Sequence, residues 1–151
     1  MDRNLLVLEK NHLKRLLPHG GLAVKIDGVV HDSNNPNTIT AWRVLDPCDL
    51  EFNGHFTNRP IYPGVCTIEL GNLAAAALIK ILYPDLKGNT IVAKNGEAGY
   101  KQQSIPGDIL FITVSLVKKK LGMFFFGEVV ITNQRDEIVT TVSYIKGTSS
   151  D

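Results

Sequence analysis

One segment of the sequence is apolar on almost every side of the helix that it predicts, and it limits the folds open to the chain. Residues 65–82 contain an alanine run at 74–77 among regularly placed Ile and Leu, and Pro84 lies just beyond the end. A helix of this kind in a soluble protein has to be enclosed by the rest of the fold. The sequence therefore predicts one buried central helix that other elements cover.

Segments rich in β-branched and aromatic residues predict the covering layer. Residues 22–30 and 38–45 flank an Asn-rich turn at 34–37, which predicts a hairpin, and residues 109–118, 123–132 and 138–146 follow one another at hairpin spacing. The spacing of the leucines within residues 4–17 predicts a short amphipathic helix that ends at Pro18. Residues 46–64 predict a loop. The simplest packing is an α+β fold in which one antiparallel sheet wraps around the helix.

The bulk properties are those of an ordinary single domain spanning residues 1–151. The 16 basic and 15 acidic residues leave no chain-wide basic field, so a nucleic-acid partner is not expected. The longest strictly apolar run, at 73–79, is far shorter than the roughly 20 residues of a membrane span. Two cysteines and a charged N-terminal segment without a secretory signal favour the cytoplasm.

A loop histidine, His55, stands fourteen positions before Glu69, which lies on the predicted central helix. Pro63 and Gly64 open that helix, and the free amides of Gly64 and Val65, at the positive end of its dipole, are suited to an oxygen that gains negative charge. Burial of Glu69 would favour its neutral form, which can donate a proton, whereas a near-neutral imidazole can accept one from carbon. These are the two roles that a β-elimination needs.

The stretch that carries this pattern resembles a family signature. Residues 54–69 read GHFTNRPIYPGVCTIE and closely resemble the GHF-x-x-x-P-x-x-PGV-x-x-x-E signature of the FabZ-type 3-hydroxyacyl-acyl carrier protein dehydratases, which adopt the hot-dog fold. The similarity continues in the Leu-Pro-His segment at 17–19, in Asp27 and in the Ile-Pro-Gly-Asp turn at 105–108, and it covers about residues 12–147.

This resemblance implies removal of water from a 3-hydroxyacyl thioester on an acyl carrier protein, giving the trans-2-enoyl thioester without cofactor or metal. It implies His55 as catalytic base, Glu69 as acid, and the Gly64 amide as donor to the carbonyl. It also implies a site completed across a homodimer, with higher homo-oligomers such as a trimer of dimers left open. Arg59 and the basic run of Lys118, Lys119 and Lys120 are candidates for carrier docking; the run is equally well explained as a solvated hairpin tip.

Departures from the family pattern leave the acyl chain length open. Thr57 replaces a proline, and Leu73, beside Asn72, replaces a glutamine four residues after the acid. The alternatives are a thioesterase or an enoyl isomerase on the same fold, or a non-catalytic module that binds acyl thioesters. The intact His55 and Glu69 argue against the non-catalytic module.

Overall fold

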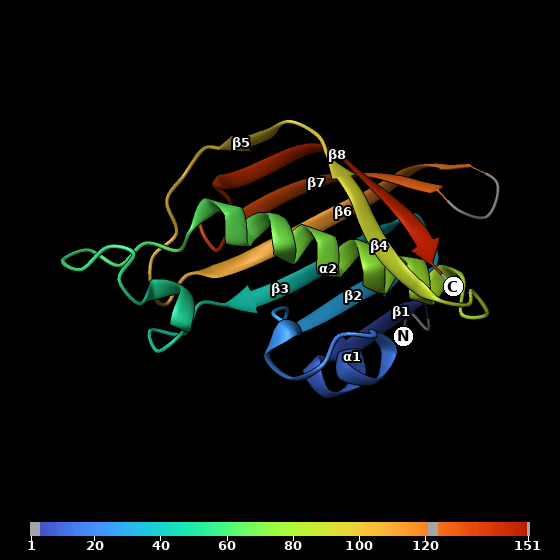
Figure 1. Ribbon diagram of the computed structural model, residues 1–151, viewed down its shortest axis with the longest axis horizontal. Helices are drawn as coiled ribbons and strands as arrows, with labels where there is room; N and C mark the ends of the chain where they lie inside the picture. The colour runs from blue at the N-terminus through green and yellow to red at the C-terminus, as the bar shows by residue number, and fades with distance from the viewer. Residues whose placement is uncertain (1–3, 121–123, 151) are drawn as a thin grey trace.

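The computed structural model describes residues 4–120 and 124–150, with the backbone alone described at 118–120, 124–126 and 149–150. A single long helix lies across a curved antiparallel sheet (Figure 1). In chain order the elements are β1 (Leu5–Glu9), α1 (Lys10–Leu16), the 3-10 turn η1 (Gly21–Ala23), β2 (Gly28–Asp32), β3 (Thr38–Val44), the 3-10 turn η2 (Leu50–Phe52), α2 (Gly64–Leu82), β4 (Asn89–Asn95), β5 (Ala98–Tyr100), β6 (Ile109–Lys120), β7 (Phe124–Asn133) and β8 (Ile138–Ser150).

The eight strands form one sheet in the order β1-β2-β3-β6-β7-β8-β4, and β5 pairs with β8 beyond the end of β4. Every pairing in this sheet is antiparallel, which the sequence predicted. The predicted hairpin of β2 and β3 and the three C-terminal strands are confirmed. The sheet therefore has two open edges, one formed by β1 and the other by β4 and β5.

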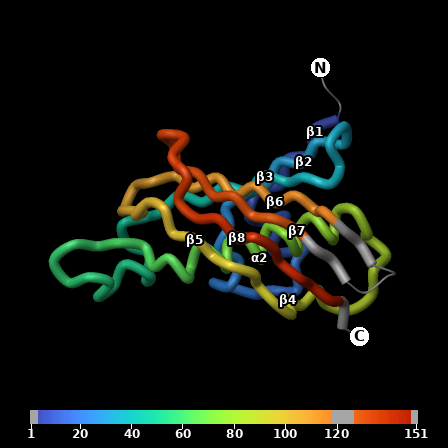
Figure 2. The backbone as a smooth tube through the Cα atoms, turned by 90° about the horizontal axis from the view of Figure 1, so that it is seen from above, coloured from blue at the N-terminus to red at the C-terminus, as the bar shows by residue number. Residues whose placement is uncertain are grey.

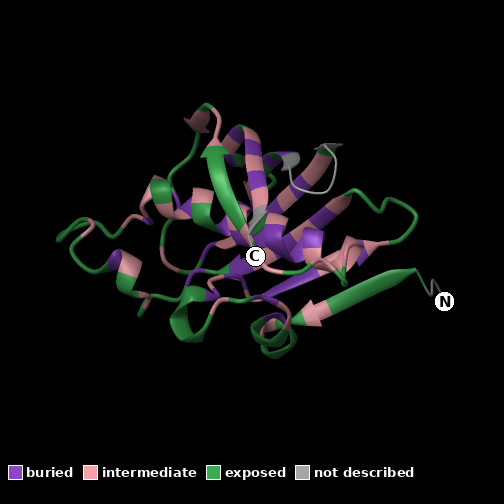
Figure 3. Cartoon of the chain, turned by 45° about the vertical axis from the view of Figure 1, so that its right-hand side comes forward, coloured by how far each residue is buried: buried purple, intermediate pink, exposed green. Residues whose placement is uncertain are grey.

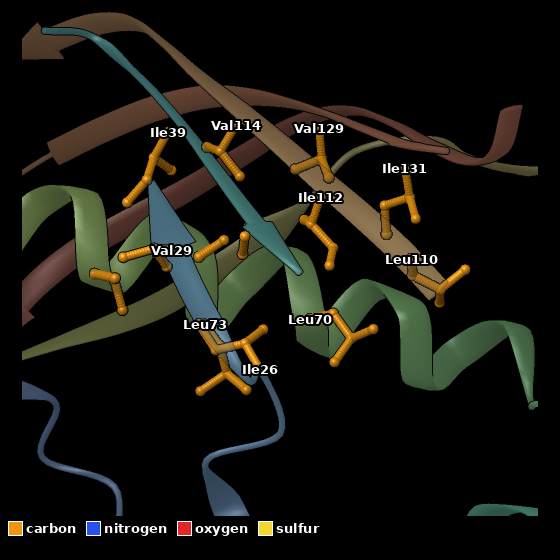
Figure 4. Close-up of a cluster of buried hydrophobic side chains, with 14 of the residues drawn as sticks. Ile26, Val29, Ile39, Leu70, Leu73, Leu110, Ile112, Val114, Val129 and Ile131 are labelled. Carbon is orange, nitrogen blue, oxygen red and sulfur yellow. The ribbon is translucent and has the colours of Figure 1, made fainter. Parts of the chain in front are cut away.

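The α2 helix is the centre of the core. Leu70 and Leu73 extend from it toward the concave face of the sheet (Figure 4), where they meet a layer of buried aliphatic side chains. By length and composition alone α2 is apolar enough to cross a membrane, with a mean hydropathy of 1.7. Half of that stretch is buried against the other elements, which is the property of a core helix. The enclosed helix predicted from the sequence is confirmed, although the helix begins one residue earlier, at Gly64.

The N-terminal prediction was wrong in its first half. Instead of one helix over residues 4–17, the chain forms β1 and then the shorter α1. The consecutive apolar residues of β1 pair with β2 in a regular register from Leu5 opposite Asp32 to Glu9 opposite Gly28. Pairing with an existing strand thus outweighed the loose helical spacing of the leucines.

The sequence prediction also missed β4 and β5, which it left within an unassigned stretch. Most side chains of β4 are exposed, so its sequence shows no apolar alternation. The register between β4 and β8 shifts between Val92 and Lys94, which further obscures the pattern. These two short strands are nevertheless important for the site, because they form the edge on which both of its pockets open.

Candidate active site

His55 lies on the loop that joins η2 to α2, and several hydrogen bonds fix this loop. The amide of His55 donates to the Phe52 carbonyl (3.2 Å), and the amide of Ile61 donates to the His55 carbonyl (2.7 Å). The next amide along, that of Tyr62, donates to the Ser104 carbonyl (2.8 Å) and joins the loop to the segment before β6. The His55–Phe56 peptide bond is cis, and the two rings stack with centroids 4.4 Å apart.

The position of one carbonyl determines the protonation pattern of the His55 ring. Nδ1 of His55 lies 2.7 Å from the carbonyl oxygen of Ile61. Because a carbonyl oxygen only accepts hydrogen bonds, Nδ1 carries the hydrogen in this contact. In the neutral ring the lone pair is then on Nε2, which can take a proton from a ligand. No sequence pattern points to this role of Ile61, because the role depends on the path of the loop.

His55 and the first turn of α2 form opposite walls of one pocket. Pro63 is the N-cap residue and no side chain caps the helix, so the amides of Gly64 and Val65 at its start have no partner within the helix. A cavity of about 350 Å³ is lined by His55, Gly64, Val65 and Tyr100 among others. The structure therefore brings the predicted base and the predicted amide donors together.

Two buried threonines hold this turn against the sheet. Oγ1 of Thr67 contacts the Gly64 carbonyl and lies 2.9 Å from Oγ1 of Thr140 on β8. Both threonines are 1% exposed, so each hydroxyl has a partner where water cannot reach it. The pair fixes the start of α2 and hence the direction of its amides. The sequence analysis did not identify these two residues.

Glu69 lies elsewhere. It is exposed in the single chain, and its burial, expected from the apolar helix around it, is wrong for one chain alone. Its Oε2 is 3.4 Å from Nδ2 of Asn72, one turn further along α2. Glu69 lines a second cavity of about 410 Å³, which runs along α2 past Leu73 and Ile79 and is closed by β4 and the inner face of the sheet. This size is within the range of small-molecule sites.

Within one chain, His55 and Glu69 therefore line different cavities. Both cavities reach the same sheet edge: Tyr100 of β5 lines the His55 cavity, whereas Ile91 and Val92 of β4 line the Glu69 cavity. All three of these edge side chains are 36% or more exposed.

The residues considered for carrier docking do not form one surface on a single chain. Arg59 is exposed beside the His55 cavity, and its guanidinium donates to Oε1 of Gln103 (3.0 Å). The basic run 118–120 lies at the far end of the 12-residue strand β6, roughly 40 Å along the strand from its start. The side chains of Lys118, Lys119 and Lys120 lie outside the described residues.

No cluster of three or more metal-ligating side chains occurs in the part of the chain that the structure describes. Cys48 and Cys66 are both free thiols. Burial, followed by the negative charge of Glu51, raises the pKa of the Cys66 thiol.

Comparison with known proteins identifies the family. The model of the ApeI-like family, described as ApeI dehydratase, matches residues 31–140. The chain belongs to the ApeI-like dehydratase family. Among its relatives is the 3-hydroxyacyl-[acyl-carrier-protein] dehydratase FabZ of Thermotoga neapolitana, 37% identical over 74% of this chain and 78% of the relative. FabZ of Haemophilus influenzae is 30% identical over 84% of this chain and 86% of that protein.

Solved structures show the same fold. The dehydratase heterocomplex ApeI:P from Xenorhabdus doucetiae aligns with a TM-score of 0.76 at 14% identity, over 92% of this chain and 91% of that one. A hypothetical thioesterase from Streptococcus pneumoniae aligns with a TM-score of 0.59 at 14% identity, over 77% of this chain and 80% of the other. The hot-dog fold of this ApeI-like dehydratase is thereby confirmed, and the family resemblance seen in residues 54–69 is confirmed with it.

Proposed function

We propose that the protein dehydrates 3-hydroxyacyl thioesters carried by an acyl carrier protein to trans-2-enoyl thioesters, at sites that two identical chains share. Membership of a dehydratase family and FabZ relatives at 29–37% identity support the reaction. The observation that carries the proposed site is the arrangement of His55, with a free Nε2, opposite the leading amides of α2 in one cavity.

The reaction follows from these groups. Nε2 of His55 takes the proton from C2 of the substrate, and the electron pair of the broken C–H bond forms the C2–C3 double bond. The amides of Gly64 and Val65 stabilise the negative charge that develops on the thioester oxygen. Glu69 protonates the departing 3-hydroxyl as the C3–O bond breaks, and water leaves. Return of the proton from His55 to Glu69 restores both groups for the next turnover.

A second chain is required because His55 and Glu69 line different cavities of one chain. A two-fold axis near the middle of the β4–β5 edge would set β5 of one chain beside β4 of its partner, as antiparallel pairing of an edge with itself does. The Tyr100 end of one chain would then meet the Ile91 end of the other, so the His55 cavity would face the partner's Glu69 cavity. The same contact would cover the exposed Glu69 carboxyl.

Mixed dimers test this arrangement. His55→Ala and Glu69→Gln should each lower kcat by at least about 100-fold, since each removes one proton-transfer group. Combining the two inactive variants should restore activity, because one site in each mixed dimer keeps both groups. Unchanged turnover in either single variant would refute the assigned roles, and no recovery in dimers shown to be mixed would refute the shared site.

A product assay separates the alternatives. A thioesterase would release a free thiol from the carrier protein, and an isomerase would move a double bond without releasing water. Dehydration releases water and leaves the thioester intact. The exposed Arg59 beside the His55 cavity supports carrier docking there through acidic residues of the carrier. The two free thiols support a cytoplasmic location, and assembly beyond the dimer belongs to the same proposal.

A further inference from the structure

The second open edge of the sheet, β1, lies on the opposite side of the sheet from β4 and β5. It projects from the body of the molecule beside the N-terminus (Figure 2) and is exposed along nearly its whole length (Figure 3). Leu5, Leu6 and Val7 are 53%, 41% and 54% exposed. Natural edge strands are usually protected by charge, proline or a bulge. No such residue stands between Leu5 and Leu8, and the pairing with β2 has no bulge.

The backbone of β1 shows which groups face the open edge. The amide of Ser33 donates to the carbonyl of Asn4 (2.9 Å), so Asn4 directs its backbone groups toward β2. Because these directions alternate along a regular strand, Leu6 and Leu8 also face β2, and the N–H and C=O groups of Leu5 and Val7 face outward.

We propose that β1 pairs antiparallel with β1 of a second copy of this chain, with Leu6 opposite Leu6. Two copies can exchange hydrogen bonds only in registers that set outward-facing residues opposite one another. The register centred on Leu6 sets Leu5 opposite Val7 at both ends and pairs the N–H and C=O groups of both residues, whereas the outward-facing groups of Glu9 lie beyond these pairs. A register centred on Val7 would instead place Leu5 opposite the charged Glu9.

The side chains of β1 also favour a second copy of this chain as the partner. Leu6 and Leu8 share one face of the strand, and Leu8 packs against the hydrophobic core. The two Leu6 side chains would therefore continue the core across the junction.

The contact has a consequence for assembly. A strand paired with itself is a two-fold contact, and the β4–β5 edge offers a second one on the other side of the sheet. Two different two-fold contacts on one chain build closed dihedral assemblies when their axes meet. This consequence rests on the dimer of the proposed function: with both contacts formed, the assembly holds more than two chains.

Disulfide trapping tests the register. In a Cys48→Ser background, Leu6→Cys would place two sulfurs across a pair whose Cα atoms are about 4.5 Å apart, within reach of a disulfide. Val7→Cys faces Leu5 in the partner, and Leu22→Cys is at a more exposed position away from the edge, 77% exposed against 41% for Leu6. Under mild oxidation Leu6→Cys should form linked pairs at least ten times faster than either control. Equal rates in all three variants, or faster linkage at Val7, would overturn the proposal.

The mass of the assembly in solution tests the β1–β1 contact without the introduction of cysteines. Val7→Pro removes an N–H that faces the open edge and leaves the ladder with β2 intact. The mass of this variant in solution should fall to that of the dimer joined at the β4–β5 edge, and Leu22→Lys should leave the mass unaltered. Equal masses for Val7→Pro and the unchanged protein would refute the pairing. The dehydratase activity per chain of Val7→Pro should differ from that of the unchanged protein by less than about two-fold. Failure of the dehydratase proposal would be seen separately, as a lack of this activity in the unchanged protein.

Discussion

At the scale of single residues, Gly64 is the position where the site tolerates least change. A Cβ atom there would come within 2.8 Å of the ring of Tyr100. Gly64→Ala should therefore displace the start of α2 or the ring, and a misplacement near 1 Å lowers kcat by about 100-fold. Steady-state kinetics should show the loss, with little change in thermal stability because Tyr100 is half exposed. Removing the ring in Gly64→Ala/Tyr100→Ala should recover at least ten-fold; no recovery would mean that the clash is not the cause.

Asp108 stabilises the turn before β6, and its contribution depends on pH. Burial of its carboxylate opposes ionisation, but hydrogen bonds from Gln134, the Ile105 amide and Arg135 outweigh this and hold its pKa below the usual value. The unfolded chain then binds the proton more readily, so the stabilisation is complete above about pH 4 and is lost as pH falls through the lower folded pKa.

Asp108→Asn should therefore lower the free energy of unfolding at pH 7 by about 1–3 kcal/mol, since the three donors to this buried side chain lose a charged acceptor. Its stability should also fall less steeply than that of the unchanged protein as the pH is lowered below about 4. Urea unfolding at a series of pH values measures both effects. Asp85→Asn, at an exposed position, is the matched control and should follow the unchanged protein; parallel pH curves for all three would contradict the assignment.

The residues of the site differ in how far the sequence could predict them. His55, Gly64 and Val65 were predicted together because they lie in one short motif whose helix start fixes the amides. The carbonyl of Ile61 was not predictable, because any residue can supply a carbonyl and only the fold of the loop brings this one to the ring. The exposure of Glu69 was not predictable either, because the apolar residues around it face the core on other sides of α2.

At the scale of elements, the sequence predicted those whose apolar pattern serves the core. The α2 helix and strands β6, β7 and β8 have side chains that pack on one another, and their signals were strong. The two edges were predicted poorly: β1 was taken for part of a helix, and β4 and β5 were missed. Edge strands have few buried side chains, so their pairing depends on backbone hydrogen bonds, which leave little trace in the sequence.

The α2 helix and the β4–β5 edge together account for the proposed function. Within one chain, α2 presents its amides in one cavity and Glu69 in another, one and a half turns further on. The two cavities lie along one helix. Because the sheet wraps around this helix, both cavities face the same open edge of the sheet. The elements that the sequence predicted least well are therefore the ones on which the proposed completion of the site depends.

At the scale of the whole molecule, we expect the space between α2 and the sheet to set the length of acyl chain that the protein accepts. The Glu69 cavity extends from the site toward Ile79 and Thr90, and two sheet positions on its wall, Gly127 and Gly147, carry no side chain. A Cβ at Gly147 would have only ordinary contacts, 3.6 Å from the Ile91 carbonyl oxygen and from Thr90. A larger side chain at Gly147 can therefore grow into the cavity without breaking the sheet.

Gly147→Leu should lower kcat/KM for long 3-hydroxyacyl chains by about 10- to 100-fold, because the loss of space for even one methylene costs about 1–3 kcal/mol. Four-carbon substrates end before the blocked region and should react within about three-fold of the unchanged rate. Gly147→Ala is the matched control, since its methyl group fits at ordinary contact distance and should leave the preference for chain length unaltered. The measurement is kcat/KM for carrier-protein substrates of increasing length. Unchanged kcat/KM at every length would place the acyl chain outside this cavity, and the chain would then have to leave the site along the surface between the two copies.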